Sequence, residues 1–326
     1  MLPGIRVSPV IAALLAVATF AALLTDIRWR TDHAAADDGL SGTASGLALE
    51  FRLYLPGAAS DGVRGTNQGS TTYVVKAGDT LFSIAKRFDT TVGVLMVANR
   101  LANRNVIQLG QTLIIPDANG RSALGYDISW PQCGGAYPET PFAFAVIGIN
   151  RHDPMTKNAC LASEVAWARQ GSFGPMLYMN TASPPAGYTS AACAAGNELC
   201  RSYQFGREAA AFSLAYANTV ASDVYYYWLD VESFNTWSTN KSANAEVVRG
   251  MIEYLQGQGK RVGLYSTWYQ WPLAVGDYTP KLPIWVPGVA KGPADGPSAC
   301  INAPIFGGGI IEMVQWTHTF DGNYLC

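Results

Sequence analysis

Apolar runs alternate with helical patterns along residues 125–326, and this alternation constrains the fold more than any other feature of the chain. The clearest helical pattern covers residues 243–256, where apolar side chains recur at helical spacing before a glycine-rich end. A strand followed by a helix, repeated, predicts an α/β fold with a mostly parallel sheet. Seven or eight such strands favour a closed β/α barrel over an open sheet. The predicted strands are residues 125–129, 142–150, 175–180, 223–232, 261–266, 284–286 and 310–316.

Carboxylates stand at the ends of two of these predicted strands. Asp127 ends the first strand, and Asp230 and Glu232 end the fourth. Barrels carry their chemistry at the carboxyl ends of the strands, and residues i and i+2 of a strand face the same side. Asp230 and Glu232 should therefore project into one pocket, where proximity and burial push their pKa values apart and leave a protonated acid beside an anion. Hydrolysis of a glycosidic bond uses such a pair.

The chain is rich in aromatic residues, with 9 Trp, 16 Tyr and 12 Phe, and only 14% of its residues are charged. This composition predicts a globular protein. Aromatic residues on or after the predicted strands could offer faces on which sugars stack, although about half of them are expected to be core residues. The candidates are Trp228, Tyr265, Trp268, Trp285 and Trp316.

Charge and motif content exclude several classes of function. With 22 Lys and Arg against 24 Asp and Glu, the protein has a net charge of -2. This charge gives no general electrostatic attraction to the phosphates of nucleic acids, so no nucleic acid partner is expected. The three histidines are scattered and no C-x-x-C occurs, which argues against a metal site. The sequence also lacks G-x-S-x-G, G-x-x-x-x-G-K-[ST] and H-E-x-x-H patterns, and no cofactor is implied.

Residues 9–24 form an uncharged, mostly apolar run that predicts export. The run is long for the core of a signal peptide and short for a membrane span. The A-x-A pattern at residues 34–36 lies ten residues beyond it, which favours an uncleaved apolar helix, and thus a single N-terminal membrane span, over a cleaved signal. Residues 1–30 are accordingly a signal peptide or a membrane anchor.

Six cysteines, all after residue 130, follow this export segment and predict disulfides formed in an oxidising compartment. Fifteen pairings of six cysteines exist. Proximity in the sequence favours Cys193–Cys200, and elimination then suggests Cys133–Cys160 and Cys300–Cys326.

Composition marks two connecting segments. Residues 31–72 are rich in Gly, Ala, Ser, Asp and Thr and predict a flexible tether, although the strand-like stretch at residues 47–55 could instead pair with the module that follows. Residues 117–124 form a second, shorter linker. Two modules are therefore expected after the tether, at residues 73–116 and 125–326.

The small module, residues 73–116, reads as strand, helix, helix, strand. A turn at Gly78 leads to a helix that Asp79 or Thr80 can cap. The pattern Y-V-V-K-x-G-D-T-L-x-x-I-A, the central Asn99 and the closing I-x-x-G-Q-x-L-x-I-P resemble a LysM domain over the whole segment. The resemblance implies a βααβ module that binds glycans containing N-acetylglucosamine, with a spacer or a protein contact as the alternative. The implied binding residues are Gly78, Asp79, Thr80, Leu81, Asn105, Val106, Ile107 and Gln108.

The large module contains G-Y-D-I-S, W-L-D-V-E, V-G-L-Y-S, P-I-W-V and V-Q-W-T in that order. These pieces resemble glycoside hydrolase family 25, the lysozymes built on a flattened, irregular TIM-like barrel. The resemblance implies that Glu232 is the general acid, with Asp230 as its partner and Asp127 shaping the site. A fourth family carboxylate, in a late D-x-N pattern, corresponds to Asp321.

These observations predict an exported cell-wall glycan hydrolase of the lysozyme (muramidase) type, acting on the β-1,4 bond of peptidoglycan. Its partner would be peptidoglycan or another glycan containing N-acetylglucosamine, and we expect a monomer. Two alternatives remain at this stage: a surface protein whose barrel binds glycan without cutting it, and a hydrolase directed at chitin.

Overall fold

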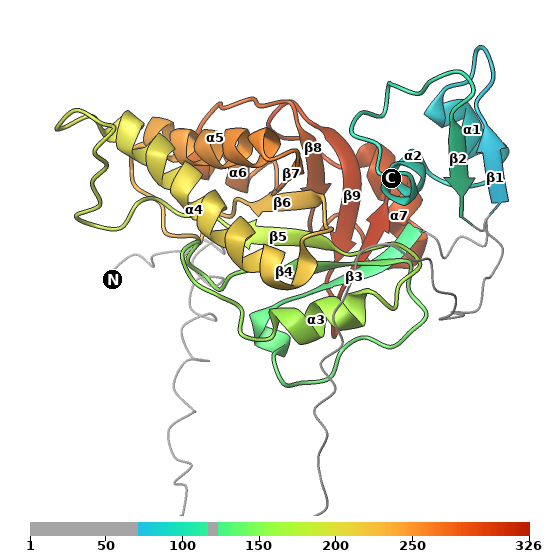
Figure 1. Ribbon diagram of the computed structural model, residues 1–326, viewed down its shortest axis with the longest axis horizontal. Helices are drawn as coiled ribbons and strands as arrows, with labels where there is room; N and C mark the ends of the chain where they lie inside the picture. Colours follow the sequence, from blue (N-terminus) through green and yellow to red (C-terminus); the bar gives the residue numbers. More distant parts are fainter. Residues whose placement is uncertain (1–70, 117–122) are drawn as a thin grey trace, which may run out of the picture. The chain divides into compact units, whose positions relative to one another are not determined.

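The computed structural model describes residues 71–116 and 123–326 (Figure 1). The predicted anchor at residues 9–24, the strand-like stretch at residues 47–55 and residues 117–122 of the linker lie outside the described residues. Across the two described ranges, every helix is too short or too polar to cross a membrane.

The small module has the predicted order of elements. Thr80 caps its first helix, because the Thr80 side chain accepts a hydrogen bond from the backbone N–H of Ser83 at 3.0 Å and the Ser83 hydroxyl accepts one from the backbone N–H of Thr80 at 3.0 Å. Asp79 instead accepts from the Tyr73 hydroxyl at 2.7 Å and from the backbone of Lys76 at 2.8 Å. The two strands pair antiparallel. The elements are β1 (Thr71–Val74), α1 (Leu81–Arg87), α2 (Val92–Ala98) and β2 (Thr112–Ile115).

The large module is a closed barrel of eight strands in the order β10-β3-β4-β5-β6-β7-β8-β9. Strands β3 to β9 run parallel to their neighbours, which confirms the predicted parallel barrel. Most of the strand residues are buried, as expected where a parallel sheet is covered by helices. The strands are β3 (Leu124–Ile128), β4 (Phe144–Gly148), β5 (Met176–Asn180), β6 (Tyr226–Asp230), β7 (Arg261–Tyr265), β8 (Pro283–Val286), β9 (Ile310–Trp316) and β10 (Asp321–Leu325).

Strand β10 was not predicted from the sequence. Its residues, DGNYL, lack the apolar run that marked the other strands. It closes the barrel by pairing antiparallel with β9 on one side and with β3 on the other. This closure brings the end of the chain next to the first barrel strand.

Helices and short turns connect the strands. Figure 1 shows α4 and α5 side by side against the barrel. Glycines allow this close approach: a Cβ at Gly206 would lie 2.1 Å from the carbonyl oxygen of Val247, and one at Gly250 would lie 2.2 Å from that of Tyr203. The helices are α3 (Leu161–Ala168), α4 (Glu198–Ala221), α5 (Lys241–Gly257), α6 (Gln270–Val275) and α7 (Gly296–Asn302), with 3-10 turns η2 (Trp130–Gln132) and η3 (Pro293–Asp295).

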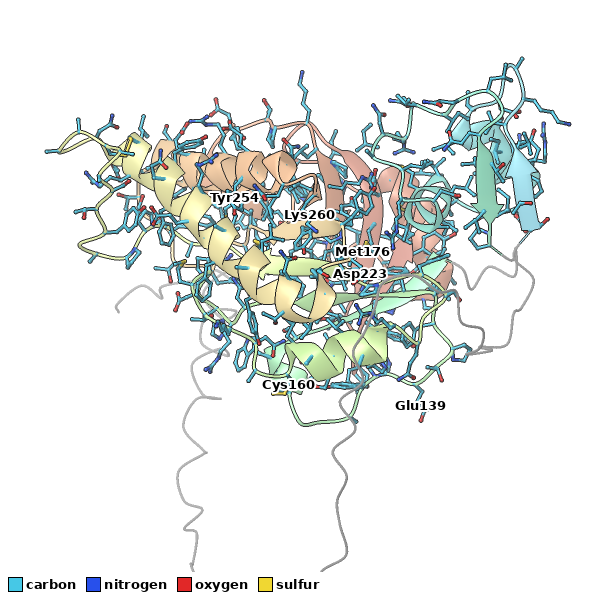
Figure 2. The ribbon with its side chains drawn as sticks, viewed as in Figure 1. Glu139, Cys160, Met176, Asp223, Tyr254 and Lys260 are labelled. Carbon is cyan, nitrogen blue, oxygen red and sulfur yellow. A yellow bond between two sulfur atoms is a disulfide. The ribbon has the colours of Figure 1, made fainter. Side chains whose placement is uncertain are left out.

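Three disulfides hold the connections of the barrel. Cys133–Cys160 joins the end of η2 to the start of α3, where Cys160 is labelled in Figure 2. Cys193–Cys200 closes a short loop onto the first turn of α4. Cys300–Cys326 ties α7 to the residue that follows β10. The structure thus contains each pairing that proximity and elimination suggested.

Candidate active site

The carboxyl ends of the parallel strands form one edge of the barrel, and the predicted catalytic residues gather there. Asp230 is the last residue of β6, and Glu232 follows two positions later. Asp230 is in register with Asn180 of β5 and Tyr265 of β7, so these three residues lie side by side at the edge of the sheet. Parallel pairing therefore places β6 and its two carboxylates in the middle of this edge.

A cavity of about 240 Å³ opens among these strand ends. All four carboxylates expected from the sequence line it, together with polar and aromatic side chains from β3, β5, β7, β8 and β9. Its lining contains no lysine, arginine or histidine. The lining residues are Asp127, Ile128, Ser129, Pro131, Gln132, Tyr178, Asp230, Glu232, Tyr265, Trp285, Gln315 and Asp321.

Asp127 is held by two side-chain amides. Its Oδ2 accepts hydrogen bonds from Asn323 Nδ2 at 2.6 Å and from Gln315 Nε2 at 2.9 Å. Burial and the nearby charge of Asp321 nevertheless raise the pKa of Asp127 to about 7, while the two amide donors lower it. Asp127 is thus a fixed carboxyl group that titrates near neutral pH.

Asp230 and Glu232 are close enough for their charges to repel each other. Burial, followed by repulsion from Glu232 and Asp127, raises the pKa of Asp230 well above its usual range. Burial also raises the pKa of Glu232, against a hydrogen bond from the Gln270 side chain that lowers it. Within the described part of the chain, Asp230 Oδ1 is buried without a hydrogen-bond partner. Burial and charge repulsion both favour the protonated form of these carboxyl groups relative to isolated ones.

Asp321 enters the site through the unpredicted strand β10. Burial raises the pKa of Asp321, and a hydrogen bond from the Thr317 side chain lowers it. The antiparallel pairing sets Asp321 opposite Asp127, so the two side chains share one face of the sheet.

Gln315 and Asn323 were not expected to be site residues. Gln315, on β9, accepts a hydrogen bond from the Tyr265 hydroxyl at 3.0 Å while donating to Asp127, so it links β7 to β3. Asn323 is completely buried on β10. Gln315 stands within V-Q-W-T, and Asn323 stands within D-x-N. Side-chain amides can donate hydrogen bonds to a carboxyl group, and their presence in these two motifs is the sequence signal that could have identified them.

The five aromatic candidates separate into three groups. Tyr265 and Trp285 line the cavity, and their rings meet edge to face with centroids 4.5 Å apart. Trp268 lies outside the lining and is 57% exposed, on the loop after β7. Trp228 and Trp316 do not fit the expected stacking role, because neither lines the cavity: Trp228 stacks on Tyr226 inside the barrel, and Trp316 packs into the hydrophobic core.

The eight residues implied for glycan binding in the small module lie on two neighbouring loops, except Leu81, which is the first residue of α1. The loops adjoin because the N–H of Gly110 donates to the carbonyl of Val75 at 2.9 Å. Val106 is exposed, whereas Leu81 is buried and is a core residue of the module rather than a free contact. Phe82 and Leu109, which were not predicted, are 71% and 75% exposed near these loops. Gly78 adopts a φ of 84°, a conformation that glycine tolerates best.

Family models match two parts of the chain. The model described as LysM domain matches residues 73–116, and the model described as Lysozyme-like protein 1 matches residues 199–299.

Curated relatives match separate parts of the chain. The secreted LysM effector ECP6 of Passalora fulva is 49% identical over 82 residues, covering 21% of this chain and 36% of the relative. The probable GH family 25 lysozyme 4 of Dictyostelium discoideum is 40% identical over 60 residues, covering 18% and 28%. Lysozyme-like protein 5 of Caenorhabditis elegans is 29% identical over 114 residues, covering 34% and 50%. The chain thus spans half or less of the length of each of these relatives.

A family 25 glycosyl hydrolase from Bacillus anthracis aligns with a TM-score of 0.40 and 14% identity, over 62% of this chain and 88% of the other. The catalytic domain of endolysin ply40, from bacteriophage P40 of Listeria monocytogenes, aligns with a TM-score of 0.41 and 16% identity, over 63% and 93%. On the family models and curated relatives, the chain contains a LysM domain at residues 73–116 and a lysozyme-like domain of the glycoside hydrolase family 25 type, matched over residues 199–299.

Proposed function

We propose that this protein is a muramidase, which hydrolyses the β-1,4 bond of peptidoglycan and is held on its substrate by the LysM domain. The observation that carries the proposal is the pair Asp230 and Glu232, facing Asp127 and Asp321 in one cavity at the carboxyl ends of the strands. Glycosidic hydrolysis needs one carboxyl group that donates a proton and a second that stabilises positive charge on the sugar.

Glu232 is the proton donor in this proposal. It is half-buried at the edge of the cavity, whereas Asp230 is buried, so Glu232 is the member of the pair that a glycosidic oxygen can reach. Burial raises the pKa of Glu232, which favours the protonated form that a general acid needs. The hydrogen bond from Gln270 orients the carboxyl group.

The other carboxyl groups act on the sugar that becomes positively charged. With the proton on Glu232, Asp230 is the anion beside it; Glu232 passes that proton to the leaving glycosidic oxygen, and the charge of Asp230 stabilises the positive charge that develops on the sugar. Asp127, fixed by Gln315 and Asn323, positions the sugar or the attacking water together with Asp321. Tyr265 and Trp285 offer aromatic surface in the cavity wall.

The LysM domain supports the choice of substrate. The loops at residues 78–81 and 105–108 would bind the N-acetylglucosamine units of the wall through backbone groups and apolar side chains. Binding by one module raises the concentration of glycan around the other, so turnover on insoluble walls should exceed turnover on short soluble fragments.

The protein would work outside the cytoplasm. The three disulfides agree with folding in an oxidising compartment. We further propose that residues 9–24 anchor the chain in the membrane, that residues 31–72 give it reach, and that it acts as a monomer.

Release of reducing ends from purified peptidoglycan tests the proposal. The Glu232→Gln variant should lose about 10²-fold or more of the wild-type rate, the scale of a general acid. Glu139→Gln is the matched control, because Glu139 is exposed and does not line the cavity. Mass spectrometry should find muramic acid at the new reducing ends. Binding to walls without release of reducing ends by the wild type would identify a glycan-binding protein, and activity on chitin alone would identify a chitinase.

A further inference from the structure

A cationic and aromatic cluster, Trp130, Arg151 and His152, lies beside the catalytic cavity and has no role in the proposed reaction. Trp130 belongs to the turn η2, which directly follows β3, and its neighbours Ser129, Pro131 and Gln132 all line the cavity. The other two residues belong to the loop after β4. Because β3 and β4 are parallel neighbours, both segments leave the same edge of the barrel.

The geometry of the cluster is specific. The guanidinium carbon of Arg151 lies 4.9 Å from the centroid of the Trp130 ring, a cation–π distance. The His152 ring meets Trp130 edge to face with centroids 5.0 Å apart. Arg151 and His152 are exposed, while Trp130 is half-buried. The indole therefore holds two cationic or polar side chains at the protein surface.

The backbone of the loop is fastened on both sides of the cluster. The N–H of Arg151 donates to the Thr156 hydroxyl at 3.0 Å, and its carbonyl accepts from Asn180 Nδ2 at 2.8 Å. The N–H of Asn180 in turn donates to Asn150 Oδ1 at 2.8 Å. Asn180 is the last residue of β5, so the sheet edge itself positions Arg151.

Among the described residues, Arg151 and Arg207 are the arginines that stack on an aromatic ring without forming an ion pair. Arg207 lies over Tyr203 and Tyr254, which do not line the cavity. Arg87 and Arg249 also lie over tyrosine rings, but each forms an ion pair with a carboxylate. Arg151 forms no ion pair with any described residue, and Asp153 two positions away does not reach it. Four carboxyl groups line the adjacent cavity, which contains no basic side chain to receive an anionic group of the substrate.

We propose that Arg151, held on Trp130 and flanked by His152, is a binding site for a carboxylate of the glycan substrate. This inference rests on the proposed function and deepens it. Peptidoglycan carries carboxylates on its stem peptides, and on the lactyl group where the peptide has been removed, whereas chitin is neutral. The guanidinium can donate two parallel hydrogen bonds to such a carboxylate while its face stays on the indole. The site would therefore select peptide-bearing wall glycan over chitin.

Binding measured by calorimetry tests the site apart from catalysis. The full-length Glu232→Gln protein, which leaves ligands uncut, is compared with the same protein carrying Arg151→Gln. The ligands are a disaccharide tripeptide from peptidoglycan, N-acetylglucosaminyl-N-acetylmuramic acid with its free lactyl carboxylate, and neutral chitobiose. Arg151→Gln should weaken binding of a carboxylate-bearing ligand about tenfold and leave chitobiose unchanged.

Lys157→Gln is the matched control. It removes a positive charge from the same loop, but Lys157 lies over Phe212 and Tyr216 of α4 rather than over Trp130. The LysM domain is identical in all proteins, so its binding cancels in the comparison.

A loss confined to the tripeptide ligand assigns the stem peptide to Arg151, and a loss confined to the free disaccharide assigns the lactyl group. Unchanged binding of both, an equal loss with chitobiose, or the same loss in Lys157→Gln would overturn the proposal.

Kinetics separates this proposal from the proposed function. Without Glu232→Gln, the Arg151→Gln variant should lose about tenfold in kcat/KM on intact walls and little on walls whose carboxyl groups have been amidated. If the wild type cleaves walls and Arg151→Gln matches the wild-type rate on both intact and amidated walls, the carboxylate site is wrong and the muramidase stands. If the wild type cleaves nothing while the calorimetric difference persists, the muramidase is wrong and the site stands.

Discussion

Asp321 lies directly opposite Asp127 in the antiparallel ladder that joins β10 to β3. Opposite residues in such a ladder have their side chains on the same face, with Cβ atoms about 5 Å apart. The last strand of the barrel thereby places a negative charge next to the carboxyl group of the first, and this repulsion helps raise the pKa of Asp127 to about 7.

Replacing Asp321 with asparagine should lower the pKa of Asp127. The substitution removes a like charge and nearly preserves the shape, so the ionised form of Asp127 becomes less costly. Carbon-13 NMR of the Asp127 carboxyl group should show its titration midpoint moving to lower pH. An unchanged midpoint would mean that burial alone raises this pKa.

Replacing Gln315 with alanine should shift the same group in the opposite direction. Gln315 donates to Asp127 Oδ2 at 2.9 Å and stabilises the ionised form, so its removal raises the pKa of Asp127 further. Loss of one charge-assisted hydrogen bond should also cost about tenfold in kcat/KM through misplacement of the carboxyl group. Gln256→Ala, on the exposed surface of α5, is the control. A rise in KM alone, with kcat and the pH profile unchanged, would contradict the positioning role.

Glu164 should make the protein less stable as pH rises. It is completely buried on α3, accepts one hydrogen bond from Asn158 at 2.6 Å, and has its pKa raised to about 7 by burial. An exposed glutamate loses its proton at about pH 4.3, so between these values the folded state binds more protons and the free energy of unfolding falls with rising pH. Glu164→Gln cannot ionise, so its advantage in melting temperature over the wild type should be larger at about pH 8 than at about pH 4. Equal differences at both pH values would refute this, and Glu139→Gln controls for net charge.

Removing the Cys300–Cys326 disulfide should lower both stability and activity. Its loop of 26 residues corresponds to about 3.5 kcal/mol of unfolding free energy in the chain-entropy model, against about 2.4 kcal/mol for the 7-residue loop of Cys193–Cys200. The first bond also fixes the end of β10, which carries Asp321 and Asn323. Each disulfide is removed by a double-serine variant, whose stability is measured by denaturant unfolding and whose activity is measured by wall hydrolysis. For the same loss of stability, Cys300→Ser with Cys326→Ser should lose more activity than Cys193→Ser with Cys200→Ser.

The LysM loops should govern binding to walls but not the chemical step. Val106 and Leu109 are exposed on the loop before β2, so Val106→Ser with Leu109→Ser should weaken sedimentation with peptidoglycan severalfold. Hydrolysis of short soluble fragments should stay at the wild-type rate. Val74→Ser, at an exposed position on β1, is the control within the same module. Equal losses on walls and fragments would indicate that the substitutions damage the fold.

The elements of this protein were largely predictable because their signals are local. The helix over residues 243–256 and the seven parallel strands each follow from the spacing of apolar side chains over a few residues. The pair Asp230 and Glu232 followed from the same local rule, since alternate residues of a strand face the same side.

The expectations that failed depend on contacts between distant parts of the chain. Trp228 is of a residue type on which sugars often stack, but its ring is buried inside the barrel, where β6 pairs with β5 and β7. Strand β10 has no apolar pattern of its own, because its stability comes from pairing with β3 and β9.

The sequence by itself determined the two modules, the barrel class and the two carboxyl groups at the end of β6, because repeating patterns of side chains encode local structure. Only the tertiary structure decided which groups surround them. Asp127 and Asn323 are 196 positions apart in the sequence, yet they share a hydrogen bond of 2.6 Å. Closing the barrel with an antiparallel strand is what brings them together, and burial inside the closed barrel is what raises the pKa values of the carboxyl groups.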